Sequence, residues 1–128
     1  MGKEYLSLDK LEVYKLAREL SKISWEIYCN LDWKDKKTQG DQLVTSTDSV
    51  GANIAEGFGR FHYLDKVRFY YNARGSLLEA RHWLDLLNER GKVKSSLQKR
   101  FLICYKNLRP ALSGLIDSVM KAKKSKNP

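Results

Sequence analysis

Apolar residues recur at alternating spacings of three and four positions in three long segments of the chain. This spacing places them on one face of an α-helix, because the helix turns by about 100° per residue. The pattern predicts helices over residues 8–31, 64–90 and 95–120. Their core-facing positions are, in turn, Val13, Leu16, Leu20, Ile23, Ile27 and Leu31; Tyr70, Ala73, Leu77, Ala80, Leu84 and Leu87; and Leu97, Phe101, Cys104, Leu108, Leu112, Leu115 and Val119.

A fourth helix, predicted over residues 41–57, has a thinner apolar stripe and many small side chains. Its core-facing positions are Leu43, Thr47, Val50 and Ile54. Serine and threonine are weak helix formers, so tertiary packing rather than intrinsic propensity must hold this helix. Gly57 and Gly59 are expected to end it, because glycine adopts the left-handed capping conformation without a Cβ clash.

The segments between these helices are short and polar or aromatic. Residues 32–40 are rich in lysine and predict a connecting loop, and residues 58–64 form a short aromatic link. The expected fold is all-α, an up-down-up-down four-helix bundle that forms one domain over residues 1–120. A basic, flexible tail is expected over residues 121–128. No apolar run is long enough to span a bilayer, so no membrane partner is expected.

The helix predicted over residues 64–90 is apolar on more than one side. Tyr71 and Leu78 point nearly opposite to its core-facing positions. A helix of this kind is usually buried on more than one side. We therefore expect the chain to form a homo-oligomer.

Three polar residues lie within or opposite the helix predicted over residues 41–57, which has many small side chains. Asn53 and Glu56 belong to it, and Arg74 lies in the next predicted helix. An unpaired buried polar group is costly, so we expect a structural polar network in which Glu56 pairs with Arg74. The alternative is a ligand-binding site at the same residues.

Two runs of residues resemble a known family. Residues 53–60 read N-I-A-E-G-F-G-R and residues 73–79 read A-R-G-S-L-L-E, and Gln42-Leu43 and Ser49-Val50 precede them. With these motifs the chain resembles the small four-helix-bundle proteins encoded in intervening sequences of bacterial 23S rRNA genes. That family shares its fold with the accessory variability proteins of diversity-generating retroelements. The resemblance implies a homo-oligomeric ring, with pentamers known among the relatives, and a partner that is rRNA or a reverse transcriptase with its RNA.

The positive charge of the chain is concentrated in its last segment. The formal net charge is +9. Lysine and arginine balance aspartate and glutamate up to Arg90, whereas the residues from Gly91 onward hold ten basic residues and a single acid, Asp117. An excess of this kind indicates a polyanionic partner such as RNA or DNA. The alternative is a solvated helix face whose lysines only aid solubility.

The basic residues of the last segment are the candidate nucleic-acid contacts. They are Lys92, Lys94, Lys99, Arg100, Lys106, Arg109, Lys121, Lys123, Lys124 and Lys126. Lys92, Lys99 and Lys106 recur every seven residues and would line one stripe of a helix. Aromatic residues that stack on bases are not interleaved with these lysines, so contacts to phosphates with low sequence specificity are expected.

No pattern in the sequence indicates catalysis. Glu79 and His82 have the spacing of half a di-iron site, but a second Glu-x-x-His is missing from the sequence. Cys29 and Cys104 are isolated, which predicts buried thiols in a reducing cytoplasm. We expect no enzyme activity, no catalytic residue, no cofactor and no metal.

The sequence therefore predicts a non-enzymatic, oligomeric, basic scaffold that binds structured RNA or other nucleic acid. The alternative is a protein-interaction adaptor, for example a reverse-transcriptase accessory protein, whose basic face meets an acidic partner. The expected location is the cytoplasm.

Overall fold

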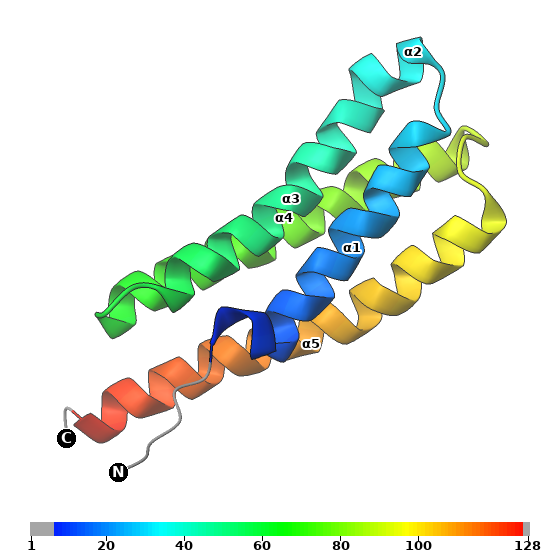
Figure 1. The fold of residues 1–128 in the computed structure, drawn as a ribbon. Coiled ribbons are helices and arrows are strands. Elements are labelled where there is room, and N and C mark those ends of the chain that lie inside the picture. Colours follow the sequence, from blue (N-terminus) through cyan, green and yellow to red (C-terminus); the bar gives the residue numbers. More distant parts are fainter. Residues whose placement is uncertain (1–6, 127–128) are drawn as a thin grey trace.

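Four long helices lie side by side in the computed structural model, which describes residues 7–126 (Figure 1). They are α1 (Glu12–Cys29), α3 (Asp41–Phe58), α4 (Tyr63–Glu89) and α5 (Ser95–Lys126). The helices α1 and α4 both pack against α3 and α5, so the order around the bundle is α1, α3, α4, α5. The described residues contain no strand, and the predicted all-α four-helix bundle is confirmed.

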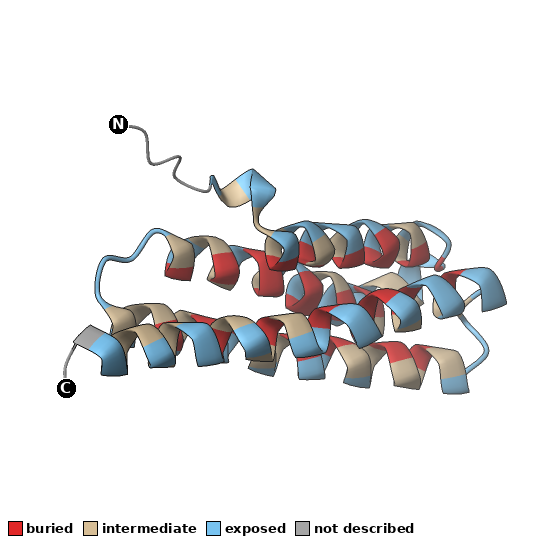
Figure 2. Cartoon of the chain, turned by 90° about the horizontal axis from the view of Figure 1, so that it is seen from below, coloured by how far each residue is buried: buried red, intermediate tan, exposed pale blue. Residues whose placement is uncertain are grey.

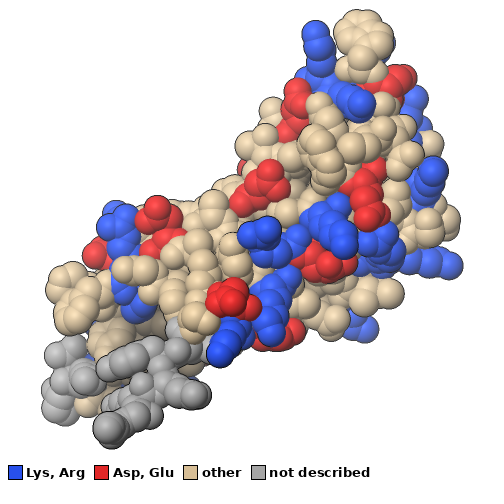
Figure 3. Space-filling model, viewed as in Figure 1, with Lys and Arg blue, Asp and Glu red and all other residues tan. Residues whose placement is uncertain are grey.

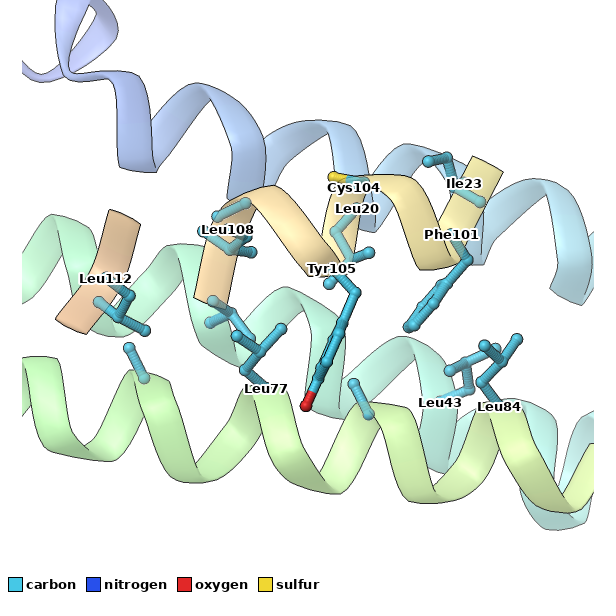
Figure 4. Close-up of a cluster of buried hydrophobic side chains, with 14 of the residues drawn as sticks. Leu20, Ile23, Leu43, Leu77, Leu84, Phe101, Cys104, Tyr105, Leu108 and Leu112 are labelled. Carbon is cyan, nitrogen blue, oxygen red and sulfur yellow. The ribbon is translucent and has the colours of Figure 1, made fainter. Parts of the chain in front are cut away.

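The core lies along the axis of the bundle, and the buried faces of the helices turn inward (Figure 2). Figure 4 shows side chains from all four long helices meeting there, among them Leu20, Leu43, Leu77 and Phe101. Full burial of a side chain of this size contributes about 1.5–3 kcal/mol. Contacts between residues distant in sequence therefore hold the helices together.

The predicted core positions of α4 are all buried, whereas α1 and α5 each differ by a few residues. Leu16, Leu115 and Val119 are only partly buried. The residues Ala17, Val67, Tyr105 and Ile116 are buried although the pattern did not place them in the core. The buried face of each of these helices is thus slightly rotated from, or wider than, the face that the three-four spacing alone predicts.

Short helical pieces occupy two places where the sequence predicted something else. A 3₁₀ turn, η1 (Leu8–Lys10), precedes α1, because the extended backbone of Leu11 (ψ 118°) interrupts the predicted helix. The predicted loop over residues 32–40 is instead α2 (Trp33–Asp35) followed by a π-helical turn, η2 (Lys36–Gly40), which continues into α3. A carboxylate oxygen of Asp32 accepts a hydrogen bond from Asp35 N at 2.9 Å and so caps α2.

The glycines at the helix ends act differently from the prediction. Gly57 lies within α3, and Gly59 follows it with a right-handed backbone (φ −79°), so the prediction of a left-handed cap at these residues is wrong. Gly57 is required by close packing, because a Cβ there would lie 2.6 Å from Tyr70 Cε1. The left-handed turn comes after α4, at Gly91 (φ 70°).

At its carboxyl end, α5 continues as far as Lys126, where the sequence predicted a flexible tail from residue 121. The lysine-rich end has no apolar periodicity, but alanine and lysine are good helix formers, so the helix propagates beyond its last buried residue, Ile116. Residues 127–128 lie outside the described part. Within residues 7–126, no helix has the length and apolar character needed to cross a membrane.

Candidate nucleic-acid interface

The predicted basic residues of α5 lie mainly on the side of the helix that faces away from the core. Lys99, Lys106 and Lys124 project within about 20° of one another, opposite the buried Leu108. The rise of 1.5 Å per residue spreads this stripe over about 37 Å of helix. Arg109 and Lys121 are also exposed, whereas Lys123 is half-buried. Lys126 lies in the last turn of the helix.

Two of the predicted contacts are neutralised within the chain. Lys92 Nζ lies 3.2 Å from Asp35 Oδ2. Arg100 Nη1 donates to Glu26 Oε2 at 2.6 Å, and its other terminal nitrogen lies 3.8 Å from Glu19 Oε1. The hydrogen bond to Glu26 is the main reason why the pKa of Arg100 is raised. These two residues tie α5 and the preceding turn to the α1–α2 region, and less of their charge is available to a partner.

The predicted stripe of Lys92, Lys99 and Lys106 is therefore wrong at its first member. Lys92 precedes α5, which begins at Ser95, so it does not lie on that helix. In the described part of the chain, no acidic side chain lies within ion-pair distance of Lys94, Lys99 or Lys106. These lysines remain available to an external anion.

Basic residues outside the predicted set lie at the same end of the bundle as the start of α5. Lys34, Lys36 and Lys37 belong to α2 and η2, which lie near the α4–α5 turn (Figure 1). On the face shown in Figure 3, basic side chains gather mostly in the half that holds this turn, with acidic side chains among them. These three lysines do not stand out in the sequence, because nearby acidic residues cancel their charges in a count along the chain.

The predicted polar network between α3 and α4 forms around different residues. Ser49 Oγ lies 2.9 Å from Ser76 Oγ, which joins the two helices. The amide nitrogen of Asn53 donates to Ser49 O at 2.9 Å and to Ser49 Oγ at 3.0 Å. Asn53 is therefore part of a polar contact between the helices, and two serines take the role predicted for charged residues.

Glu56 and Arg74 do not form the predicted buried pair. Glu56 Oε2 accepts a hydrogen bond from Arg60 Nη2 at 3.1 Å, one turn further along the chain, and its side chain is 59% exposed. The guanidinium carbon of Arg74 lies 4.7 Å from the ring centroid of Tyr71. A partner about one turn away along the chain satisfies each group, so a buried pair between the helices was not required.

The other residues considered for chemistry have structural contacts. His82 is exposed, and its ring meets the edge of Trp83, whose indole nitrogen donates to Glu79 Oε2 at 3.0 Å. Cys104 Sγ donates to Leu16 O at 3.3 Å, and burial raises the pKa of this thiol to about 11. A thiol of that pKa holds little thiolate at neutral pH and is a poor nucleophile. Cys29 is exposed, so the prediction of a buried thiol is wrong at that residue.

The family model described as 23S rRNA-intervening sequence protein matches residues 9–114, which is most of the chain. The chain belongs to this family. The match ends within α5, before Lys121, so the last turns of the basic helix lie beyond the matched region of the family.

A solved structure shares this fold. It is the crystal structure of a protein of unknown function from the S23 ribosomal protein family of Bacteroides thetaiotaomicron. The two chains are 21% identical, with a TM-score of 0.75, and the alignment covers 82% of this chain and 95% of the other. No curated protein matches the chain.

Proposed function

We propose that this chain is a non-enzymatic cytoplasmic scaffold that binds structured RNA, or other nucleic acid, with low sequence specificity. The observation that carries the proposal is the lysine stripe of α5, defined as Lys99, Lys106 and Lys124, which is exposed and has no acidic partner among the described residues. A row of ammonium groups along one helix neutralises phosphates and releases their counterions without reading bases. Membership of the 23S rRNA-intervening sequence family supports RNA as the partner.

We further propose that the scaffold is a homo-oligomer, with the pentameric ring of the resembling proteins as the expected form. Leu64, Tyr71 and Leu78 recur every seven residues on the outer side of α4 and are between 46% and 61% exposed. This is the spacing at which a helix packs along a second helix. A hollow on α3, lined by Ala52, Ala55 and Gly59 and by the ion pair of Glu56 with Arg60, offers a second copy a surface to pack against. A second copy is therefore the proposed occupant of this face.

The nucleic-acid proposal is tested by measuring affinity for a structured RNA as a function of salt concentration. The variant Lys99→Gln/Lys106→Gln removes two charges seven residues apart from the stripe. Its matched control is Lys15→Gln/Lys22→Gln, which removes two exposed charges at the same spacing from α1. Each lost phosphate contact reduces the slope of log affinity against log salt by about 0.9 for a duplex.

We expect the α5 variant to flatten this slope by about two and the α1 variant to leave it nearly unchanged. A chain ending at Met120 should also bind more weakly, because it lacks the four terminal lysines. Equal losses in the α1 and α5 variants would show that net charge, and not the stripe, governs binding. Binding to an acidic polypeptide but not to RNA at low salt would favour the adaptor, such as an accessory protein of a reverse transcriptase.

A further inference from the structure

Two large aromatic side chains are exposed at the end of the bundle where α2 meets the α4–α5 turn. Trp33, in α2, is 72% exposed, and Trp25, near the end of α1, is 55% exposed. The indole is among the most favourable side chains to remove from water. Two exposed tryptophans at one end of a small bundle therefore indicate a surface that a partner covers.

Each of these aromatic groups has a lysine beside it. The ammonium of Lys37 lies 5.5 Å from the centroid of the Trp33 ring. Trp25 stacks on Tyr28, with ring centroids 5.2 Å apart and planes inclined by 15°, and the ammonium of Lys36 lies 5.4 Å from the Tyr28 ring centroid. Ammonium groups of η2 thus lie beside aromatic rings of α1 and α2.

The start of α5 joins this group of residues across a hollow. Trp25 and Glu26 of α1 and Asn30, which follows that helix, line one side, and Lys94 and Ser96 line the other. The hollow has a volume of about 370 Å³, within the range of small-ligand sites, roughly 300–1,000 Å³. Tertiary packing therefore places a tryptophan beside a basic residue of the last segment, although the two are far apart in sequence.

We propose that this surface, the aromatic–basic end formed by Trp25, Tyr28, Trp33, Lys36, Lys37 and Lys94, binds unpaired nucleotides of an RNA strand. Bases stack on the exposed indoles, and the adjacent lysines neutralise the phosphates of the same strand. In a duplex the base faces are hidden in the stack, so only a loop, bulge or free end offers both contacts. The inference rests on the proposed function and names the part of the RNA that this end recognises.

The opposite end of the bundle provides a contrast. Phe61 is 89% exposed there, but the nearby cations are used within the chain. Lys66 Nζ donates to Gly57 O at 3.2 Å and to Phe58 O at 2.9 Å, and partial burial lowers the pKa of this lysine. Arg60 pairs with Glu56. Arg60 and Lys66 are therefore engaged within the chain, whereas Lys37 and Lys94 have no acidic partner among the described residues.

The test compares an unstructured oligouridine strand with an RNA duplex of equal length, using the full chain and fluorescence anisotropy. Trp33→Ala should weaken binding of the single strand by about 5- to 150-fold, the range for the loss of one stacked base, and change duplex binding little. Trp33→Phe should restore most of the affinity, because it keeps an aromatic face. Phe61→Ala, the matched control, should bind both ligands as the wild type does. Oligouridine should also quench tryptophan emission in the wild type.

Equal effects of Trp33→Ala on strand and duplex, or no effect on either, would overturn the inference and leave the lysine stripe of α5 intact. A change confined to the oligomeric state would also overturn it, since the surface would then bind a second copy. If the wild-type chain binds neither RNA at low salt, the proposed function itself fails. These outcomes separate the two proposals.

Discussion

Gly57 shows how closely α3 and α4 pack. A Cβ at this position would lie 2.6 Å and 2.9 Å from ring carbons of Tyr70 and 3.2 Å from Lys66 O. Tyr70 is itself buried, so its ring has no free space to move into. The residue that sequence analysis assigned to capping is needed for helix contact.

We predict that Gly57→Ala destabilises the chain by about 1–3 kcal/mol, the usual cost of overpacking a core. The matched control is Gly114→Ala in α5, where a new Cβ meets no atom within 4 Å. That change should stabilise by up to about 1 kcal/mol, because alanine is the better helix former. Urea unfolding curves measure both. A Gly57→Ala variant as stable as the wild type would contradict the close packing of α3 on Tyr70.

Polar residues were harder to place from sequence than apolar ones. The sequence indicated correctly that Asn53 has a polar partner, but it could not show that Ser49 and Ser76 supply the contact between helices. A charged residue on a helix can pair with a residue one turn away, as Glu56 does with Arg60. The helix pattern does not distinguish such a local pair from a pair between helices.

At the scale of elements, the sequence predicted the four long helices because each has a sustained apolar period. It failed between them, where residues 32–40 are helical despite their polar composition. Two residues in the sequence could have indicated that this segment is ordered. One is Asp32, whose side chain caps the segment, and the other is Gly40. A Cβ on Gly40 would lie 2.8 Å from Leu31 Cδ1, so a glycine that reads as a loop residue is a site of close packing.

The aromatic–basic end could not be found by reading along the chain. Trp25 and Lys94 line one hollow, yet 68 residues of sequence separate them. Only the folding of α5 alongside α1 brings them together. Lys99 and Lys106 of the lysine stripe, by contrast, are seven residues apart within one helix. Their shared face was therefore predicted from sequence.

At the scale of the whole molecule, the outer side of α4 is the surface on which the proposed assembly depends. We predict that Leu78→Asp weakens self-association and leaves the helix content unchanged, since Leu78 is half exposed in the single chain and a charge there must be desolvated on assembly. Ile103→Asp, at an exposed apolar position on α5, is the control and should assemble like the wild type. Sedimentation velocity gives the masses. A wild-type chain that sediments at 14.9 kDa at all concentrations tested would contradict the homo-oligomer.

Lysine footprinting shows whether α5 carries the nucleic-acid contacts that the proposed function requires. The chain is acetylated briefly with and without a structured RNA, and the modification of each lysine is measured by mass spectrometry. We predict that RNA protects Lys99, Lys106 and Lys124 and leaves Lys15 and Lys22 on α1 as reactive as in the free chain. Protection of the α1 lysines with full reactivity along α5 would contradict the proposed function.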